Sequence, residues 1–138
     1  MKTFNRLLII ASMIILASSC GRVDLAGEWK IVSVGSEQIQ DSKAVPTLSF
    51  NEETGQIHGY TGVNIVNGEY VQEGRKLSLK GLGMTMMAGP AEDMALERKI
   101  VSAFENIHST KLNENDELLL LDQQGDTLMV LARRSDIE

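Results

Sequence analysis

The fold of this chain depends on one stretch of sequence, which reads Gly59-Tyr60-Thr61-Gly62-Val63-Asn64-Ile65-Val66-Asn67-Gly68-Glu69-Tyr70. It places three glycines and two asparagines between two strand-like runs. Glycine adopts backbone conformations that a Cβ forbids, and asparagine tolerates left-handed positions and bonds its own backbone. We therefore expect a tight turn within 59–64 and a close backbone contact or bulge at Gly68, because a glycine inside a strand marks such a place. We therefore assign Gly59, Gly62 and Asn64 a structural role in the backbone conformation and no catalytic role.

Strand patterns extend outward from this stretch in both directions. Residues 28–34 and 47–50 alternate between apolar and polar, so Trp29 and Phe50 should point inward. The polar turn 51–55 predicts a hairpin, and residues 69–71 and 76–80 continue the strands, with Tyr70 in the first of them. Residues 118–121 and 128–131 are continuous apolar runs, which predicts a hairpin covered on both faces.

One helix is expected, beginning near Pro90 and ending near Ile107. Proline suits the first helical position, and Glu92 and Asp93 follow in the first turn, where the helix dipole favours acids. The apolar stripe of this helix contains Leu96, Ile100, Ala103, Phe104 and Ile107. Together these elements predict a mainly β member of the α+β class. The sheet should be antiparallel and strongly twisted, forming an open barrel against which the single helix, at about 91–107, packs.

The amino terminus resembles a bacterial lipoprotein signal. Met1 to Arg6 is basic, Leu7 to Leu16 is apolar, and small residues lead to Cys20, the only cysteine. The resemblance implies cleavage before Cys20, acylation of that residue, and a stable membrane anchor, since several acyl chains hold where one does not. The other interpretation is a plain signal peptide that leaves a free thiol. We expect a signal peptide at 1–19, a short tether at 20–24, one domain at 25–134 and a charged tail at 135–138.

Composition excludes several classes of function. Removal of residues 1–19 takes away two of the 13 basic residues and none of the 19 acidic ones, so the formal net charge falls from −6 to −8. Such a chain is not expected to bind nucleic acid or to adhere electrostatically to anionic lipid. A single cysteine permits no intrachain disulfide.

Glu97 is the carboxylate with two possible roles. It lies beside the apolar stripe of the predicted helix, where a carboxylate must be paired or hydrogen-bonded. It could be the acid or base of an enzyme site, or it could accept hydrogen bonds from backbone N–H groups or a basic side chain. We favour the structural role, because no His, Ser or Cys is placed by the sequence to work with it.

Metal and cofactor sites are not expected. Met84, Met86, Met87 and Met94 form a cluster of thioethers, which can bind Cu(I), but methionine more often fills irregular cores. His58 and His108 are isolated in the sequence and are interpreted as surface or edge residues. The sequence therefore predicts no metal and no cofactor.

The order and spacing of these segments resemble the META domain, the family that includes the bacterial heat-shock protein HslJ. The resemblance covers nearly the whole chain after the signal and rests on the Trp29 strand, 46–50, 59–64, 68–70, Leu77, Thr85 to Pro90, Met94 to Glu97, 118–120 and Gly125. It implies a compact, barrel-like twisted sheet with one helix, in which the matched residues, Thr85 among them, are structural. Many members have cysteines where this chain has Val63 and Gly89. The resemblance therefore implies that a disulfide found in those members is absent here.

The resemblance implies no settled enzymatic activity, and links the family to stress tolerance and the cell envelope. We therefore expect a non-catalytic binding or chaperone-like lipoprotein, on the outer membrane facing the periplasm, with an envelope protein or a lipid as its partner. The alternatives are an envelope enzyme that uses Glu97, an acyl-chain-binding protein similar to a secretion pilotin, and a purely structural or stress-induced accessory protein.

Overall fold

A computed structural model describes residues 21–40 and 44–135. The predicted signal peptide at 1–19, Cys20 and the end of the charged tail lie outside these residues. The elements in chain order are β1 (Gly27–Val34), β2 (Glu37–Gln38), β3 (Thr47–Asn51), β4 (Gln56–Tyr60), β5 (Ile65–Glu73), β6 (Lys76–Met84), α1 (Ala91–Asn106), β7 (Ser109–Leu112), β8 (Leu118–Leu121) and β9 (Thr127–Arg133).

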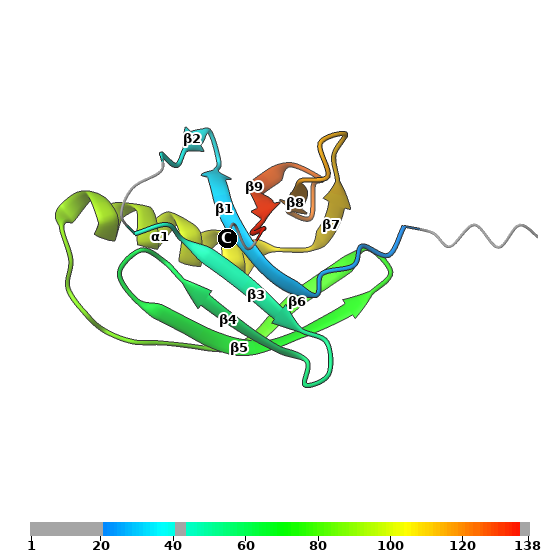
Figure 1. The fold of residues 1–138 in the computed structure, drawn as a ribbon, viewed down its shortest axis with the longest axis horizontal. Helices are drawn as coiled ribbons and strands as arrows, with labels where there is room; N and C mark the ends of the chain where they lie inside the picture. Colours follow the sequence, from blue (N-terminus) through cyan, green and yellow to red (C-terminus); the bar gives the residue numbers. More distant parts are fainter. Residues whose placement is uncertain (1–20, 41–43, 136–138) are drawn as a thin grey trace, which may run out of the picture.

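The strands form one antiparallel sheet that curls into a ring (Figure 1). The order is β2-β1-β3-β4-β5-β6-β7-β8-β9, and a further pairing of β1 with β9 closes it. The closure is uneven, because β1 and β9 pair from Trp29 to Val34 whereas β6 and β7 share only the pair Lys76 and Ser109. Within the described residues the predicted mainly β class with one helix is confirmed, and the barrel-like ring is nearly open at the seam between β6 and β7.

The core lies inside the ring and under the helix. Trp29, as expected from its strand pattern, is fully buried. On α1 the buried residues are Glu97, Ile100, Ala103 and Phe104, while Leu96 is only half-buried. The apolar stripe was therefore predicted correctly at its centre, but the carboxylate of Glu97 is buried with it. Pro90 stands at the N-cap, one position before the one predicted for it.

The stretch that determines the fold, residues 59–70 (the deciding stretch), contains one turn and one bulge. The turn spans 61–64 and depends on Gly62, whose φ of +98° is a left-handed conformation that favours glycine. Gly59 lies inside β4 instead of in the turn. At Gly68 the register of β5 against β6 shifts, and a Cβ there would lie 2.8 Å from the carbonyl oxygen of Lys80. The close contact predicted for Gly68 is confirmed.

Two other expectations need correction. The hairpin of β8 and β9 is buried on one face only: Leu118 and Leu120 are fully buried, while Leu119 and Leu121 are half-buried. The tether predicted at 20–24 is packed against the ring from Val23 onward, since Val23 is 6% exposed and Leu25 is fully buried. Within the described residues no helix is long and apolar enough to span a bilayer.

Candidate functional site

A buried polar cluster joins the turn of the deciding stretch to the helix. Its centre is Asn64, which is 1% exposed. The Nδ2 group donates to the carbonyl oxygen of Met87 at 3.0 Å and to the carboxylate of Glu97, with 2.9 Å to Oε2. The Oδ1 atom accepts from the Thr85 hydroxyl at 2.9 Å and from the Met87 N–H at 2.6 Å. Both donors and both lone pairs of the amide are therefore used.

Thr61 completes the cluster from the other side of the turn. Its hydroxyl donates to Glu97 Oε2 at 2.5 Å and accepts from the N–H groups of Val63 and Asn64. Thr85 in turn accepts from the Ile65 N–H at 2.9 Å. The cluster binds together the β4–β5 turn, the segment after β6, and α1, and each of its side chains is satisfied.

Glu97 is thus positioned as an acceptor inside the protein. It is 4% exposed, and its two oxygens face the Thr61 hydroxyl and the Asn64 amide. Sequence reasoning identified Glu97, Asn64 and Thr85, but it missed Thr61. One signal in the sequence could have indicated Thr61. A carboxylate in an apolar stripe needs hydrogen-bond donors, and a hydroxyl group three residues before Asn64 could supply one.

Two aromatic residues singled out in the sequence have different surroundings. The Trp29 Nε1 donates to the Leu25 carbonyl at 2.9 Å, and the Arg133 guanidinium stacks 4.4 Å from its ring centroid. Tyr70 packs edge-on against Phe50, with ring centroids 5.1 Å apart. Burial raises the pKa of the Tyr70 phenol above its ordinary value, and the negative charge of Glu52 adds to this effect.

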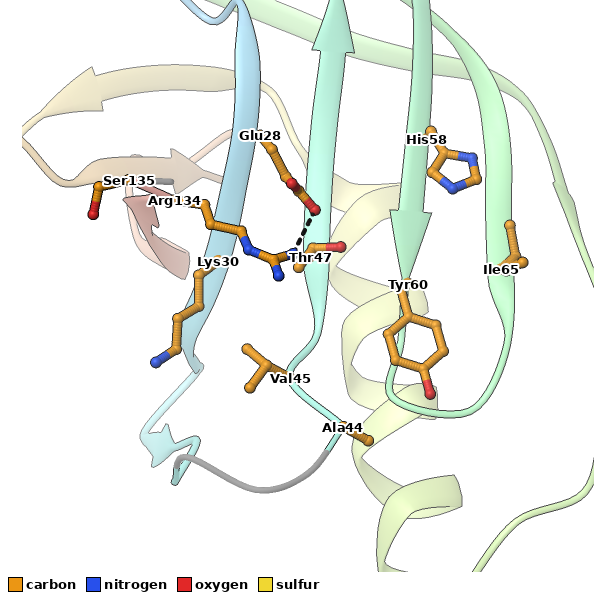
Figure 2. Close-up of a pocket in the computed structure, with 10 residues that line it drawn as sticks. All are labelled: Glu28, Lys30, Ala44, Val45, Thr47, His58, Tyr60, Ile65, Arg134 and Ser135. Atoms are coloured by element: carbon orange, nitrogen blue, oxygen red, sulfur yellow. Dashed lines mark hydrogen bonds and ion pairs between the residues drawn. The ribbon is translucent and has the colours of Figure 1, made fainter. Parts of the chain in front are cut away.

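An open groove lies on the outer face of the sheet (Figure 2). It has a volume of about 840 Å³ and crosses β1, β3, β4 and β5. Strand alternation places its residues outside the core, because their neighbours Trp29, Leu48 and Ile57 point inward. Its lining consists of Glu28, Lys30, Ala44, Val45, Thr47, His58, Tyr60, Ile65, Arg134 and Ser135.

The groove combines an apolar end with a polar side. Tyr60 and Ile65 are cross-strand partners, and the Tyr60 hydroxyl donates to the Gly62 carbonyl at 2.9 Å, which fixes the ring. His58 Nδ1 lies 2.7 Å from Asn67 Oδ1, and this hydrogen bond orients the ring. Glu28 and Arg134 form an ion pair of 3.0 Å on the β1 side of the groove, drawn as a dashed line in Figure 2.

The remaining sequence candidates are not brought together. His58 lies in the groove, whereas His108 lies at the seam, where its carbonyl accepts from the Leu77 N–H. Met86 and Met87 are 89% and 60% exposed, so they do not fill the core. Among residues 21–40 and 44–135, no group of three or more His, Cys, Asp or Glu side chains could hold a metal ion.

Comparisons with known proteins agree on the fold. An NMR structure of a protein from Burkholderia xenovorans matches with a TM-score of 0.64 and 26% identity, over 80% of this chain and 84% of that one. A crystal structure of a DUF4847 family protein from Bacteroides vulgatus matches with a TM-score of 0.57 and 13% identity, over 82% of this chain and 96% of that one. No curated protein matches the sequence. The sequence model of the META domain matches residues 23–135, and the chain therefore belongs to the META domain family.

Proposed function

We propose that this protein is a lipid-anchored, non-catalytic binding module of the cell envelope, on the outer membrane facing the periplasm. Its groove on the outer face of β1, β3, β4 and β5 would receive a segment of another envelope protein. The groove is the observation that carries the proposal, because it presents apolar and polar side chains together on a rigid sheet.

The proposed location in the cell envelope depends on the amino-terminal sequence. A basic start, a short apolar run and small residues leading to Cys20 are the pattern of a lipoprotein signal. The acidic balance of the chain agrees with an anchor that is hydrophobic rather than electrostatic.

The position of Glu97 supports a non-catalytic role for this residue. An acid or base must reach the proton that it transfers. Glu97 is buried and its oxygens are occupied by Thr61 and Asn64, so a substrate would have to displace a satisfied internal network.

The lining of the groove favours a polypeptide over an acyl chain. An acyl chain needs an enclosed apolar cavity, whereas the inward positions of the ring are filled by large side chains such as Trp29, Leu48 and Leu131, all fully buried. In the groove, Tyr60 and Ile65 can contact an apolar side chain, while the His58 ring can form a hydrogen bond with a peptide backbone.

The experiment compares two matched substitutions on β5. Ile65 and Val71 are 39% and 41% exposed, but only Ile65 lines the groove. The native acylated protein is purified with its bound partners, these are identified by mass spectrometry, and binding of a purified partner is then measured. Ile65→Lys should weaken binding by about tenfold or more, whereas Val71→Lys should leave it unchanged. Equal binding by the wild type and by Ile65→Lys would exclude the groove as the binding site of the partner.

A second variant separates binding from catalysis. Glu97→Gln should lower the melting temperature, because an amide NH₂ would face the Asn64 NH₂ group, while an envelope phenotype of the folded protein persists. A folded Glu97→Gln protein with no remaining phenotype would instead support an enzyme.

A further inference from the structure

The segment that follows Cys20 is fixed to the ring rather than free. Val23 and Leu25 are buried in the core, and the Gln72 side chain donates to the Val23 carbonyl at 2.8 Å. Arg133 donates to the carbonyls of Ala26 and Asp24 at 2.8 and 2.9 Å. The start of the described chain therefore has a defined position on the molecule.

At that end of the ring the β3–β4, β5–β6 and β7–β8 hairpins turn, and the first two of these turns contact the start of the described chain. Arg75, in the β5–β6 turn, lies against Gly21 so closely that a Cβ on this glycine would be 2.5 Å from the Arg75 Nε. Arg22 lies 3.9 Å from Glu52, in the β3–β4 turn. In Figure 1 the start of the described chain (blue) lies on the right, near the β5–β6 turn, while the start of α1 lies on the left.

We propose that this end of the ring, formed by residues 21–24 and the turns 51–55 and 73–75, is the face that rests on the membrane. The inference depends on the proposed acylation of Cys20. Cys20 is bonded directly to Gly21, and one residue spans at most about 3.6 Å. An acylated Cys20 in the headgroup layer thus holds both hairpin turns at the membrane surface, since no slack chain separates them from the anchor.

Charge at this end does not supply the attachment. The basic residues of these segments are Arg22 and Arg75, and the acidic residues Asp24, Glu52, Glu53 and Glu73 outnumber them, so the segments offer no net attraction to anionic lipid. The two arginines, next to the anchor, can still contact lipid phosphates. The orientation should therefore be the same on anionic and zwitterionic membranes.

The same orientation leaves the groove accessible. Thr47 begins β3 and Asn51 ends it at the membrane-facing turn. The groove row of Thr47, Tyr60 and Ile65 therefore lies at the other end of these strands, away from the lipid. A partner could reach it without displacing the domain from the surface.

Single thiols test the orientation. Cys20 is the only cysteine, and its acylation would leave no free thiol, so an engineered cysteine can be labelled alone. Glu53→Cys lies in the β3–β4 turn and Glu92→Cys in the first turn of α1; both glutamates are exposed, so the two variants are matched in charge and accessibility. The full acylated chain is placed in phosphatidylethanolamine and phosphatidylglycerol vesicles that contain a headgroup-nitroxide lipid, and quenching of a thiol-attached fluorophore is measured.

The label at residue 53 should be quenched severalfold more than the label at residue 92. A flexible Gly/Ser insertion of about ten residues between Cys20 and Gly21 should reduce this difference. Equal quenching at both positions, or stronger quenching at residue 92, on a chain that floats with the vesicles would overturn the orientation alone. A chain without acyl mass that does not float would overturn the proposed anchor, and the orientation with it.

Discussion

At the scale of the residue, Asn64 does the most to fix the turn. Its side chain reaches both the segment after β6 and the carboxylate on α1, and all of its hydrogen-bonding capacity is used. The side chain of Asn67, three residues later, bonds the exposed ring of His58. The two asparagines of the deciding stretch thus differ in burial, and the cost of removing them should differ accordingly.

Asn64→Ala should lower the free energy of unfolding by about 3 kcal/mol, because it leaves the Met87 N–H and the Glu97 carboxylate without their buried partner. Asn67→Ala, at the surface, should change it by less than about 0.5 kcal/mol. Urea denaturation of both variants measures the difference. Equal losses would mean that the buried cluster contributes no more than a surface contact.

The sequence could predict part of this cluster. A carboxylate beside an apolar stripe has to find donors, so Glu97 could be singled out. Its donors, Thr61 and Asn64, lie 36 and 33 residues earlier in the chain. Only the turn at 61–64 brings them to the helix, and a side-chain orientation set by tertiary contacts is not visible in local sequence patterns.

At the scale of the element, the β5–β6 hairpin is shaped by glycines with different functions. Gly68 lies under the bulge, where a Cβ would meet the Lys80 carbonyl at 2.8 Å and Leu82 Cδ2 at 2.9 Å. Gly83 has nothing within 4 Å of its Cβ position and no left-handed φ. The sequence indicated a close contact at Gly68, but the contacting residue follows from the pairing register alone.

Gly68→Ala should cost about 1–3 kcal/mol, because the backbone carbonyl of Lys80 would have to move. Gly83→Ala should be neutral or stabilising by up to about 1 kcal/mol, since it only restricts the unfolded chain. Thermal unfolding followed by circular dichroism compares them. If the two variants melted at the same temperature, the close approach at Gly68 would not be a constraint.

The positions at which many META proteins have cysteines are adjacent in this chain. A Cβ built on Gly89 lies 3.7 Å from the Val63 Cβ, within the range of a disulfide, and Gly89 has no left-handed φ. Here the branched side chain of Val63 fills the space that Gly89 leaves, with Cγ2 3.0 Å from the same position.

The double variant Val63→Cys, Gly89→Cys should therefore form a disulfide. Closing this loop should stabilise the oxidised protein by up to about 3 kcal/mol relative to the reduced one. Mass spectrometry and melting curves with and without reductant, in a Cys20→Ser background, measure both effects. A double variant that keeps two free thiols under oxidising conditions would show that the two segments are farther apart.

At the scale of the whole molecule, the ring has one strong closure and one weak seam. The class and the single helix could be predicted from periodicity, because each strand and the helix have their own pattern. The pairing of β1 with β9 could not, since these strands lie about a hundred residues apart and no local pattern connects them. Beyond Leu77, whose N–H donates to the His108 carbonyl, the described structure shows β6 without a strand on that side.

Strand alternation points the Leu79 N–H to the same open side as that of Leu77. The Leu79 amide should therefore exchange with solvent about tenfold or more faster than the Ile31 amide, which donates to the Pro46 carbonyl at 2.9 Å. Hydrogen exchange followed by NMR gives both rates. Similar protection at the two amides would mean that the seam is covered in solution.

The link between Arg133 and the start of the chain has a consequence for biosynthesis. Arg133 stacks on Trp29 and holds the carbonyls of Asp24 and Ala26, so the first segment of the domain is secured by one of its last residues. A ribosome synthesises β1 first and β9 last. The ring can close only when β9 is available to pair with β1. The ring of the nascent protein consequently stays open until nearly the whole domain has been synthesised.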